Sequence, residues 1–398
     1  MKNQFLNQHL NQQIVEITPQ VIAWRRYLHQ HPEISFKEYN TSQFVFDTLT
    51  SFGGLVVTRP TPTSVMARII GKKEGRTIAL RADMDALPLQ EENQCDYKSQ
   101  NDGVMHACGH DGHTAGLLAV AKILSTCTDD INGEVRFIFQ HAEELPPGGA
   151  SEMVKSGVLE GVDMIFGIHL WSSIPVGKVA LINGPMMAAA DNFKIEVIGK
   201  GGHGGWPHLS IDCITIGALL VNSLQHIISR QIDPLESAVL SITKFIGGSS
   251  YNIIPNTAEI SGTIRTFDKH VRQHIKSSMI NMIDGITKAH NATYKFDYID
   301  GYNAVINNPD AITIATHAVK NELGEEFIYH PKPNMAGEDF SLFLEHVTGC
   351  FMFVGAGNAS KGIEYPHHHP LFNIDEEALL HSVKIFIGLV KLNNLSLK

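Results

Sequence analysis

Side chains of the kinds that bind divalent metal ions stand at the ends of apolar runs in this sequence. They are Cys108, His110, Glu143, Glu144, His169 and the three histidines at 367–369. Thiols, imidazoles and carboxylates are costly to hold near an apolar core unless something compensates them. A divalent metal ion compensates all three at once, so the sequence predicts a metal-dependent hydrolase.

The spacing of these residues suits a site with two metal ions. Two ions about 3.5–4 Å apart can activate a shared water molecule and polarise a carbonyl group. Cys108 and His110 can face one such site, and a thiolate can bridge two ions. In the pair Glu143 and Glu144, one carboxylate can bind metal while the other acts as general base. Taken singly, Cys108 could be a core cysteine, Glu143 and Glu144 a solvated pair, and His169 a core histidine. The combination of these residues favours the metal site.

The bulk properties narrow the class of protein. The chain has 398 residues, of which 43% are hydrophobic, which predicts two domains. A net charge of -10 without a basic block argues against nucleic acid or an anionic membrane as partner. The N-terminal residues show no apolar signal segment, and five scattered cysteines do not suggest a disulfide framework, so we expect a cytoplasmic protein.

The first half of the chain alternates between short apolar strands and helices. Thr18-Pro19 predicts the start of a helix over 19–30, and His113 begins a run that predicts a buried helix. The expected strands are 65–70, 77–80, 134–140 and 164–169. This alternation predicts an α/β fold, with a mostly parallel sheet between helices and ligands at the carboxyl ends of the strands.

The pattern changes near residue 188. A strand over 193–198 alternates apolar and polar residues, and a compact α+β module follows it. Its other elements are a helix over 211–230, strands over 238–246 and 257–265, a helix over 268–289 and a strand over 292–299. A buried strand over 350–357 then resembles the first half again. We therefore expect a catalytic domain of residues 1–188 and 304–398, interrupted by an inserted domain of residues 189–303.

Ten segments together resemble the M20 metallopeptidase family. They are RRYLHQHPEISFKE (25–38), LRADMDALP (80–88), MHACGHDGHT (105–114), FQHAEELPPGGASEM (139–153), GIHLWSSIPVGK (167–178), GPMMAAADNFKIEVIGKGGHG (184–204), NIIPN (252–256), GTIRT (262–266), GEDFS (337–341) and HHPLFNIDE (368–376). More narrowly, the chain resembles the amidohydrolase branch, which includes N-acyl-amino-acid, hippurate and indoleacetyl-amino-acid hydrolases. The resemblance implies a dimetal catalytic domain and a smaller lid domain that often mediates dimers.

The resemblance also implies roles for individual residues. The implied metal ligands are Cys108, His110, Glu144, His169 and His368, with Asp85 behind them. Glu143 is the implied general base, and His203 is the lid histidine that approaches the scissile carbonyl. Asn252 and Arg265 match positions that hold a substrate carboxylate, although Arg265 could instead form an internal ion pair. His368 keeps the His-x-Pro-x-Phe spacing, and His369 is the alternative.

The implied activity is hydrolysis of the amide bond of N-acyl amino acids, which releases a carboxylic acid and a free amino acid. The implied cofactors are two divalent ions, Mn²⁺ or Zn²⁺, with Co²⁺ or Ni²⁺ as alternatives. We expect a homodimer or higher homo-oligomer formed through the lid domain. The alternatives are a dipeptidase or carboxypeptidase of the same fold, and a non-catalytic binding homologue.

Overall fold

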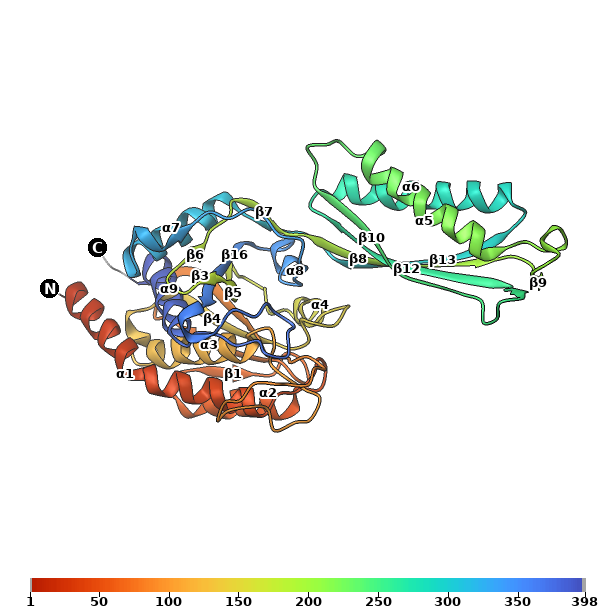
Figure 1. Cartoon of the computed structure of the whole chain (residues 1–398). Helices are drawn as coiled ribbons and strands as arrows, with labels where there is room; N and C mark the ends of the chain where they lie inside the picture. Colours follow the sequence, from red (N-terminus) through yellow and green to blue (C-terminus); the bar gives the residue numbers. More distant parts are fainter. Residues whose placement is uncertain (1, 396–398) are drawn as a thin grey trace. The chain divides into compact units, whose positions relative to one another are not determined.

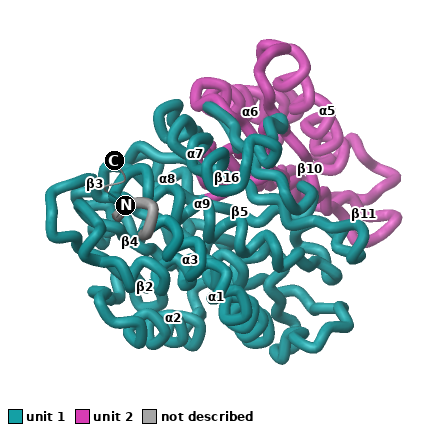
Figure 2. The backbone as a smooth tube through the Cα atoms, turned by 90° about the vertical axis from the view of Figure 1, so that its left-hand side faces the viewer, with its two compact units in different colours: residues 1–186, 306–332, 339–398 teal, residues 187–305, 333–338 magenta. Residues whose placement is uncertain are grey.

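The chain forms two compact units in the computed structural model, which describes residues 2–395 (Figures 1 and 2). Unit 1 comprises Met1–Met186, Ile306–Lys332 and Asp339–Lys398, and unit 2 comprises Met187–Val305 and Pro333–Glu338. The sequence placed the boundaries after residues 188 and 303. The segment Pro333–Glu338 is an additional part of unit 2 that the sequence analysis did not separate from its surroundings.

Unit 1 contains an eight-stranded sheet in the order β1-β2-β4-β3-β5-β16-β6-β15. Its strands are β1 (Val56–Thr58), β2 (Val65–Ile70), β3 (Lys73–Asp83), β4 (Asn132–Gln140), β5 (Met164–Pro175), β6 (Val179–Ala180), β15 (Ile328–Tyr329) and β16 (Thr348–Gly357). The central strands β4, β3, β5 and β16 run parallel, whereas β1, β2 and β4 pair antiparallel, as do β16 and β6. The predicted α/β fold with a mixed, mostly parallel sheet is confirmed.

Helices cover this sheet. They are α1 (Lys2–Gln30), α2 (Tyr39–Ser51), α3 (His110–Ser125), α4 (Gly149–Lys155), α7 (Pro309–Glu322), α8 (Ser341–Leu344) and α9 (Glu377–Asn394), with short 3-10 turns η1 (Thr128–Asp130), η3 (Glu325–Phe327) and η4 (Ala359–Lys361). Helices α3 and α9 pack on β3, and α1 packs on both helices (Figure 1). Nearly every residue of α3 is buried, so the helix that begins at His110 is held on all sides.

One helix prediction was wrong. The expected helix over 19–30 is the second half of α1, and Pro19 lies inside the helix rather than at its start. The cause is the apolar stripe formed by Leu10, Ile14, Ile17 and Val21, which are all buried in the core. Its helical spacing continues across Pro19, so packing of this stripe offsets the one backbone hydrogen bond that proline cannot donate.

Unit 2 is a four-stranded antiparallel sheet with two long helices, α5 (Cys213–Gln231) and α6 (Lys269–Ala289). The strand order is β10-β12-β8-β13, with bounds Ala238–Gly247, Thr257–Thr266, Ala189–Ile198 and Thr293–Tyr302. Both helices contribute to one core on a single face of the sheet. Beyond one end of the sheet, β9 (Gly202–His203) pairs with β11 (Ile253–Ile254), and η2 (Pro207–Leu209) follows β9.

Two further strands, β7 (Gly184–Met187) and β14 (Val305–Asn307), pair with each other where the chain changes units. Within residues 2–395, no helix combines the length and apolarity that a membrane crossing needs. All five cysteines lie in this range as free thiols.

Candidate metal centre

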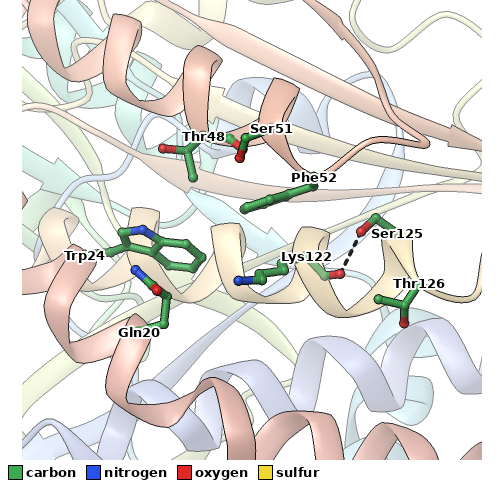
Figure 3. Close-up of a pocket in the computed structure, with 8 residues that line it drawn as sticks. All are labelled: Gln20, Trp24, Thr48, Ser51, Phe52, Lys122, Ser125 and Thr126. Atoms are coloured by element: carbon green, nitrogen blue, oxygen red, sulfur yellow. Dashed lines mark hydrogen bonds between the residues drawn. The ribbon is translucent and has the colours of Figure 1, made fainter.

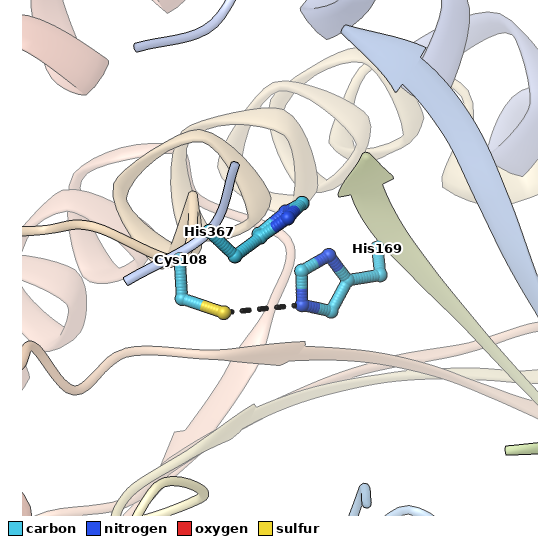
Figure 4. A group of neighbouring side chains, drawn as sticks. All are labelled: Cys108, His169 and His367. Atoms are coloured by element: carbon cyan, nitrogen blue, oxygen red, sulfur yellow. Dashed lines mark hydrogen bonds between the residues drawn. The ribbon is translucent and has the colours of Figure 1, made fainter. Parts of the chain in front are cut away.

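Most of the predicted metal-binding residues converge at the carboxyl ends of the parallel strands of unit 1. Cys108 precedes α3, His110 begins it, and His169 lies on β5. The Sγ atom of Cys108 lies 3.4 Å from Nε2 of His169 (Figure 4). One ligand atom from each of Cys108, His110 and Glu144 lies within 4.8 Å of the others. Cys108 also groups with His169 and His367, so it takes part in two overlapping groups of possible ligands.

Hydrogen bonds fix the direction in which the ligand nitrogens point. Nδ1 of His110 lies 2.8 Å from the backbone carbonyl of Asp85, and Nδ1 of His169 lies 2.9 Å from the carbonyl of Leu170. A carbonyl only accepts, so Nδ1 donates in both rings, and Nε2 is the nitrogen that can bind a metal ion once it has lost its proton. This arrangement is typical of histidines that bind metal through Nε2.

Asp85 connects the two halves of the centre. Its carboxylate lies 3.2 Å from Nδ1 of His110 and accepts hydrogen bonds from the backbone N–H of Glu144 at 3.0 Å and the Ser35 hydroxyl at 2.7 Å. The carboxylate is completely buried, yet these donors keep the pKa of Asp85 below its ordinary value against the effect of burial. Asp85 therefore holds an imidazole and a glutamate in fixed positions relative to each other.

The chemistry of the donor set fits a cation. Within residues 2–395, Nε2 of His110 and Oε1 of Glu144 are buried without a hydrogen-bond partner, although Oε1 of Glu144 faces Nε2 of His368 at 3.3 Å. Burial would lower the pKa of His110, but the charges of Asp83 and Asp85 outweigh it and raise that pKa to about 10. Burial, with the nearby Glu144 and Glu143 carboxylates, raises the pKa of the Cys108 thiol. Negative potential and unpartnered ligand atoms are the conditions that a divalent ion satisfies.

A neighbouring group that also resembles a ligand set is already occupied. Asp83, His110 and His113 lie together, but both nitrogens of His113 are engaged. Its Nδ1 lies 2.5 Å from Asp83, and its Nε2 accepts the N–H of Leu170 at 2.8 Å. Asp83 also accepts from Arg81 at 2.6 Å. Burial would raise the pKa of Asp83, but the charges of His110, His113 and Arg81 hold that pKa well below its ordinary value. Asp83 and His113 therefore support the centre from outside it.

The three consecutive histidines occupy different environments. Nε2 of His368, the favoured ligand, lies 3.3 Å from Oε1 of Glu144. The alternative His369 stacks on Tyr365 at 4.5 Å, and its Nδ1 accepts the N–H of Leu371. His367 was not favoured by its spacing, yet it groups with Cys108 and His169 (Figure 4). Its Nε2 donates to the Leu170 carbonyl at 3.0 Å, which leaves Nδ1 available.

Two residues with left-handed backbone lie within the site. Ala142, which precedes Glu143, has a φ of 49°, and His368 has a φ of 63°. Residues with a Cβ atom rarely adopt this region, and they cluster where a fold must direct a side chain. The Glu143–Glu144 pair thus leaves β4 through a forced turn rather than a relaxed loop.

Unit 2 brings His203 and Asn252 together. His203 lies on β9 opposite Ile253 of β11, and the N–H of Gly204 donates to the carbonyl of Asn252 at 2.8 Å. Nδ1 of His203 accepts the N–H of Gly205 at 3.0 Å, so the ring can donate from Nε2. The His203 side chain is exposed and lies 4.8 Å from the ring of Trp206.

Arg265 lies far from both of these residues. It stands opposite Ala190 near one end of β12. Strand β9, labelled in Figure 1, and its partner β11 lie beyond the other end, which begins at Thr257. At about 3.3 Å per residue, the eight steps from Thr257 to Arg265 span about 26 Å. A single chain therefore does not bring Asn252 and Arg265 to one carboxylate.

Arg265 is not neutralised by an internal ion pair. Its guanidinium donates to the Thr263 hydroxyl and the Ile264 carbonyl, and among the described residues no carboxylate pairs with it. The backbone carbonyl of Asp191 accepts from Arg265 at 3.5 Å, but the Asp191 carboxylate pairs with Arg272 at 2.7 Å. Ala190 shares a face of the sheet with Arg265, so the side chain of Asp191 points to the opposite face.

A cavity of about 430 Å³ lies apart from these residues, between α1, α2 and α3 (Figure 3). Its lining residues are Gln20, Trp24, Thr48, Ser51, Phe52, Lys122, Ser125 and Thr126. The ammonium group of Lys122 lies 5.7 Å from the Trp24 ring and 5.8 Å from the Phe52 ring. The Lys122 ammonium group thus lies near both aromatic rings, where a bound cation would otherwise contact them.

Comparison with known proteins places these observations in a family. The family model described as Peptidase family M20/M25/M40 matches residues 79–392. An N-acyl-L-amino acid amidohydrolase from Geobacillus stearothermophilus is 59% identical over 292 residues, which cover 73% of this chain and 79% of that protein. Thermostable carboxypeptidase 1 from Saccharolobus solfataricus is 43% identical over 94% of this chain and 95% of its own length.

A solved structure is also similar. The crystal structure of a dinuclear metal binding peptidase from Bacillus subtilis superposes with a TM-score of 0.83 and 35% identity. The superposition covers 95% of this chain and 98% of that one.

Proposed function

Because the chain belongs to the M20 peptidase family and is therefore a hydrolase, we propose that it hydrolyses the amide bond of N-acyl amino acids. The observation that carries the proposal is the pair of overlapping ligand groups that share Cys108. The 59% identity to an N-acyl-L-amino acid amidohydrolase supports this substrate class.

We assign the ligands of two divalent ions to Cys108, His110, Glu144, His169 and His368, with His367 as the alternative to His368. The similarity to a dinuclear metal binding peptidase supports the count of two. When bound, the ions supply Lewis acidity toward a water molecule and the acyl carbonyl. Thiolate and imidazole favour Zn²⁺, while carboxylate and imidazole equally accept Mn²⁺, Co²⁺ or Ni²⁺.

Side chains of the protein perform the remaining steps of the proposed reaction. Glu143 takes a proton from the attacking water and passes it to the leaving amine. His203 donates from Nε2 to the oxygen that becomes negative, and the Gly205 N–H that holds its Nδ1 supports this direction. Arg265 receives the free carboxylate of the substrate through two charge-assisted hydrogen bonds.

The distance between Arg265 and the His203 end of unit 2 favours an assembly of two chains. One substrate molecule is too short to contact both ends of the same sheet. We therefore propose a homodimer in which Arg265 of one chain acts together with His203 and Asn252 of the other.

The edge strand β10 is the candidate contact between the two chains. It lies at one edge of the sheet of unit 2 and exposes Phe245 and Ile246, next to the exposed Ile214 and Leu219 of α5. The opposite edge, β13, exposes Lys295, Asp297 and Asp300 beside Ile299, whereas the exposed charge on β10 is that of Lys244, which pairs with Glu259. An apolar edge strand is a ready site for strand pairing, whereas charges on an edge oppose it. Ile246→Lys should convert the dimer to a monomer in sedimentation velocity and reduce turnover.

The test of the activity is reconstitution with a substrate panel. The metal-stripped protein is loaded with each of the four ions and assayed with N-acetyl, N-benzoyl and longer N-acyl amino acids beside dipeptides. Release of amino acid from the N-acyl substrates supports the proposal. Exclusive cleavage of peptides would favour a carboxypeptidase or dipeptidase instead, as the 43% identity to a carboxypeptidase allows.

A further inference from the structure

Glu38 is a fully buried carboxylate that the proposed chemistry does not use. It stands immediately before α2, in the N-cap position, but its side chain makes no capping hydrogen bond to that helix. An ionised carboxylate is expensive to bury, so the contacts that Glu38 makes elsewhere must offset this cost.

Those contacts join two strained segments. Oε1 of Glu38 accepts the N–H of Ala142 at 2.8 Å and the N–H of Phe36 at 2.9 Å. Both donors have left-handed backbone, with φ of 49° at Ala142 and 64° at Phe36. Residues with a Cβ atom rarely adopt this conformation, because the Cβ atom then comes too close to the following carbonyl oxygen. A single carboxylate oxygen thus holds two unfavourable backbone conformations.

The position of Ala142 makes this clamp relevant to the site. Ala142 directly precedes Glu143, and its carbonyl accepts the N–H of Gly149 at 2.8 Å. The two peptide planes that flank Ala142 are therefore both held, one through its N–H by Glu38 and the other through its carbonyl by the first residue of α4. Without the first bond, Ala142 would relax toward the right-handed region, and Glu143 would leave β4 in another direction.

We propose that Glu38 is a positioning residue that directs the Glu143 carboxylate by fixing the left-handed backbone of Ala142. The proposal rests on the proposed function, in which Glu143 is the general base. Displacement of a catalytic group by about 1 Å can reduce turnover about 100-fold without weakening substrate binding. Glu38 therefore contributes to kcat rather than to KM or to metal content.

The test compares variants that keep or remove the acceptor. Glu38→Met has a similar volume but no acceptor, and we expect kcat to fall about 10- to 100-fold with KM and bound metal unchanged. Glu38→Gln retains an acceptor oxygen and should recover most of this loss. Should Glu38→Met not fold, Glu38→Asp withdraws the oxygen from Ala142 and should lower kcat in the same way.

Two further variants separate positioning from packing. Ala142→Gly added to Glu38→Met should restore part of kcat, because glycine adopts left-handed backbone at no steric cost. Glu33→Met is the matched control, because Glu33 accepts the N–H of Thr41 in α2 but has no hydrogen bond to Ala142. It should lower thermal stability and leave kcat near wild type.

Three outcomes would overturn the proposal. They are wild-type kcat in Glu38→Met, no recovery in the double variant, or a loss of metal that matches the loss of activity. The role of Glu143 is tested separately by Glu143→Gln. Full activity in that variant would refute the proposed mechanism, whatever the Glu38 variants show.

Discussion

Nε2 of His368 lies 3.3 Å from Oε1 of Glu144, although Glu144 precedes the whole of unit 2 in the sequence and His368 follows it. The contact brings the last predicted ligand to the glutamate pair that follows β4. The backbone N–H of His368 also donates to the Ala107 carbonyl at 2.9 Å, next to Cys108. The segment around His368 is thus held at the candidate metal centre by one main-chain hydrogen bond and one side-chain contact.

The first prediction concerns this ligand. His368→Ala should reduce bound metal, measured by mass spectrometry of the desalted protein, because one of the two ions loses an imidazole. His369→Ala is the control and should retain both ions, since His369 stacks on Tyr365. Loss of metal in His367→Ala but not in His368→Ala would move the assignment to His367.

Glu143→Gln should keep the metal and lose turnover. The amide has the same shape but cannot take a proton from water, so we expect kcat to fall at least about 10²–10⁴-fold. Metal analysis and steady-state kinetics on the same preparation check both parts. A variant that turns over at the wild-type rate would show that another group is the base.

Cys108 should be protected from alkylation when metal is bound. Burial raises the pKa of the free thiol, whereas a metal ligand is held as thiolate and shielded. Iodoacetamide labelling with and without chelator, mapped by mass spectrometry, measures this protection. The buried Cys350 is an internal control that should stay unlabelled in both conditions while the fold is intact. Equal labelling of Cys108 in both conditions would argue against ligation.

Arg265 should determine the preference for a free carboxylate. Hydrogen bonds between charged groups contribute about 1.5–3 kcal/mol, so wild type should favour an N-acyl amino acid over its amide about 10- to 100-fold in kcat/KM. Arg265→Ala should abolish that preference and leave metal content unchanged. Equal rates of wild type on acid and amide would indicate a general amidase.

The stability of the folded protein should decrease as pH rises from about 4.5 to about 7 through Glu38. Burial and the charge of Asp85 raise the pKa of Glu38 to about 7. Between the ordinary pKa of a glutamate and this value, the folded state holds a proton that the unfolded chain has released, so rising pH favours unfolding. This effect amounts to roughly 3 kcal/mol.

Denaturant unfolding of Glu38→Gln and wild type at pH 5 and pH 8 measures the effect. Glu38→Gln lacks the titrating group, so its stability relative to wild type should increase with pH. A constant difference between the two proteins would contradict the shifted pKa.

The sequence predicted the fold because its main signals are local. Strand β2 has the predicted bounds, and β10, β12 and α6 differ from prediction by a residue or so. These elements follow from apolar periodicity and turn residues, which neighbouring positions determine. Pro19 suggested the start of a helix, but the helix continues through it because the long apolar stripe of α1 is buried in the core. That burial depends on the whole folded protein and not on the residues next to Pro19.

The candidate site was predictable in residue type and less so in arrangement. Motifs suggested Cys108, Glu144 and His169, but spacing alone did not indicate that His367 lies beside Cys108. The contact between Glu38 and Ala142 joins segments that are distant in sequence, so no local pattern encodes it. Glu38, the last residue of the segment 25–38 that carries the family resemblance, was the available indication of this contact.

The order of strands in unit 1 also constrains how the protein is made. Strand β16 lies between β5 and β6, although the whole of unit 2 is synthesised before it. During translation, one edge of β5 therefore remains unpaired while the inserted unit emerges. That unit can fold independently in the meantime. The proposed ligands His367 and His368 arrive only with the segment after β16. A chain released before that segment would expose the apolar edge of a central strand and lack these two histidines, so under the proposed assignment it would bind metal incompletely.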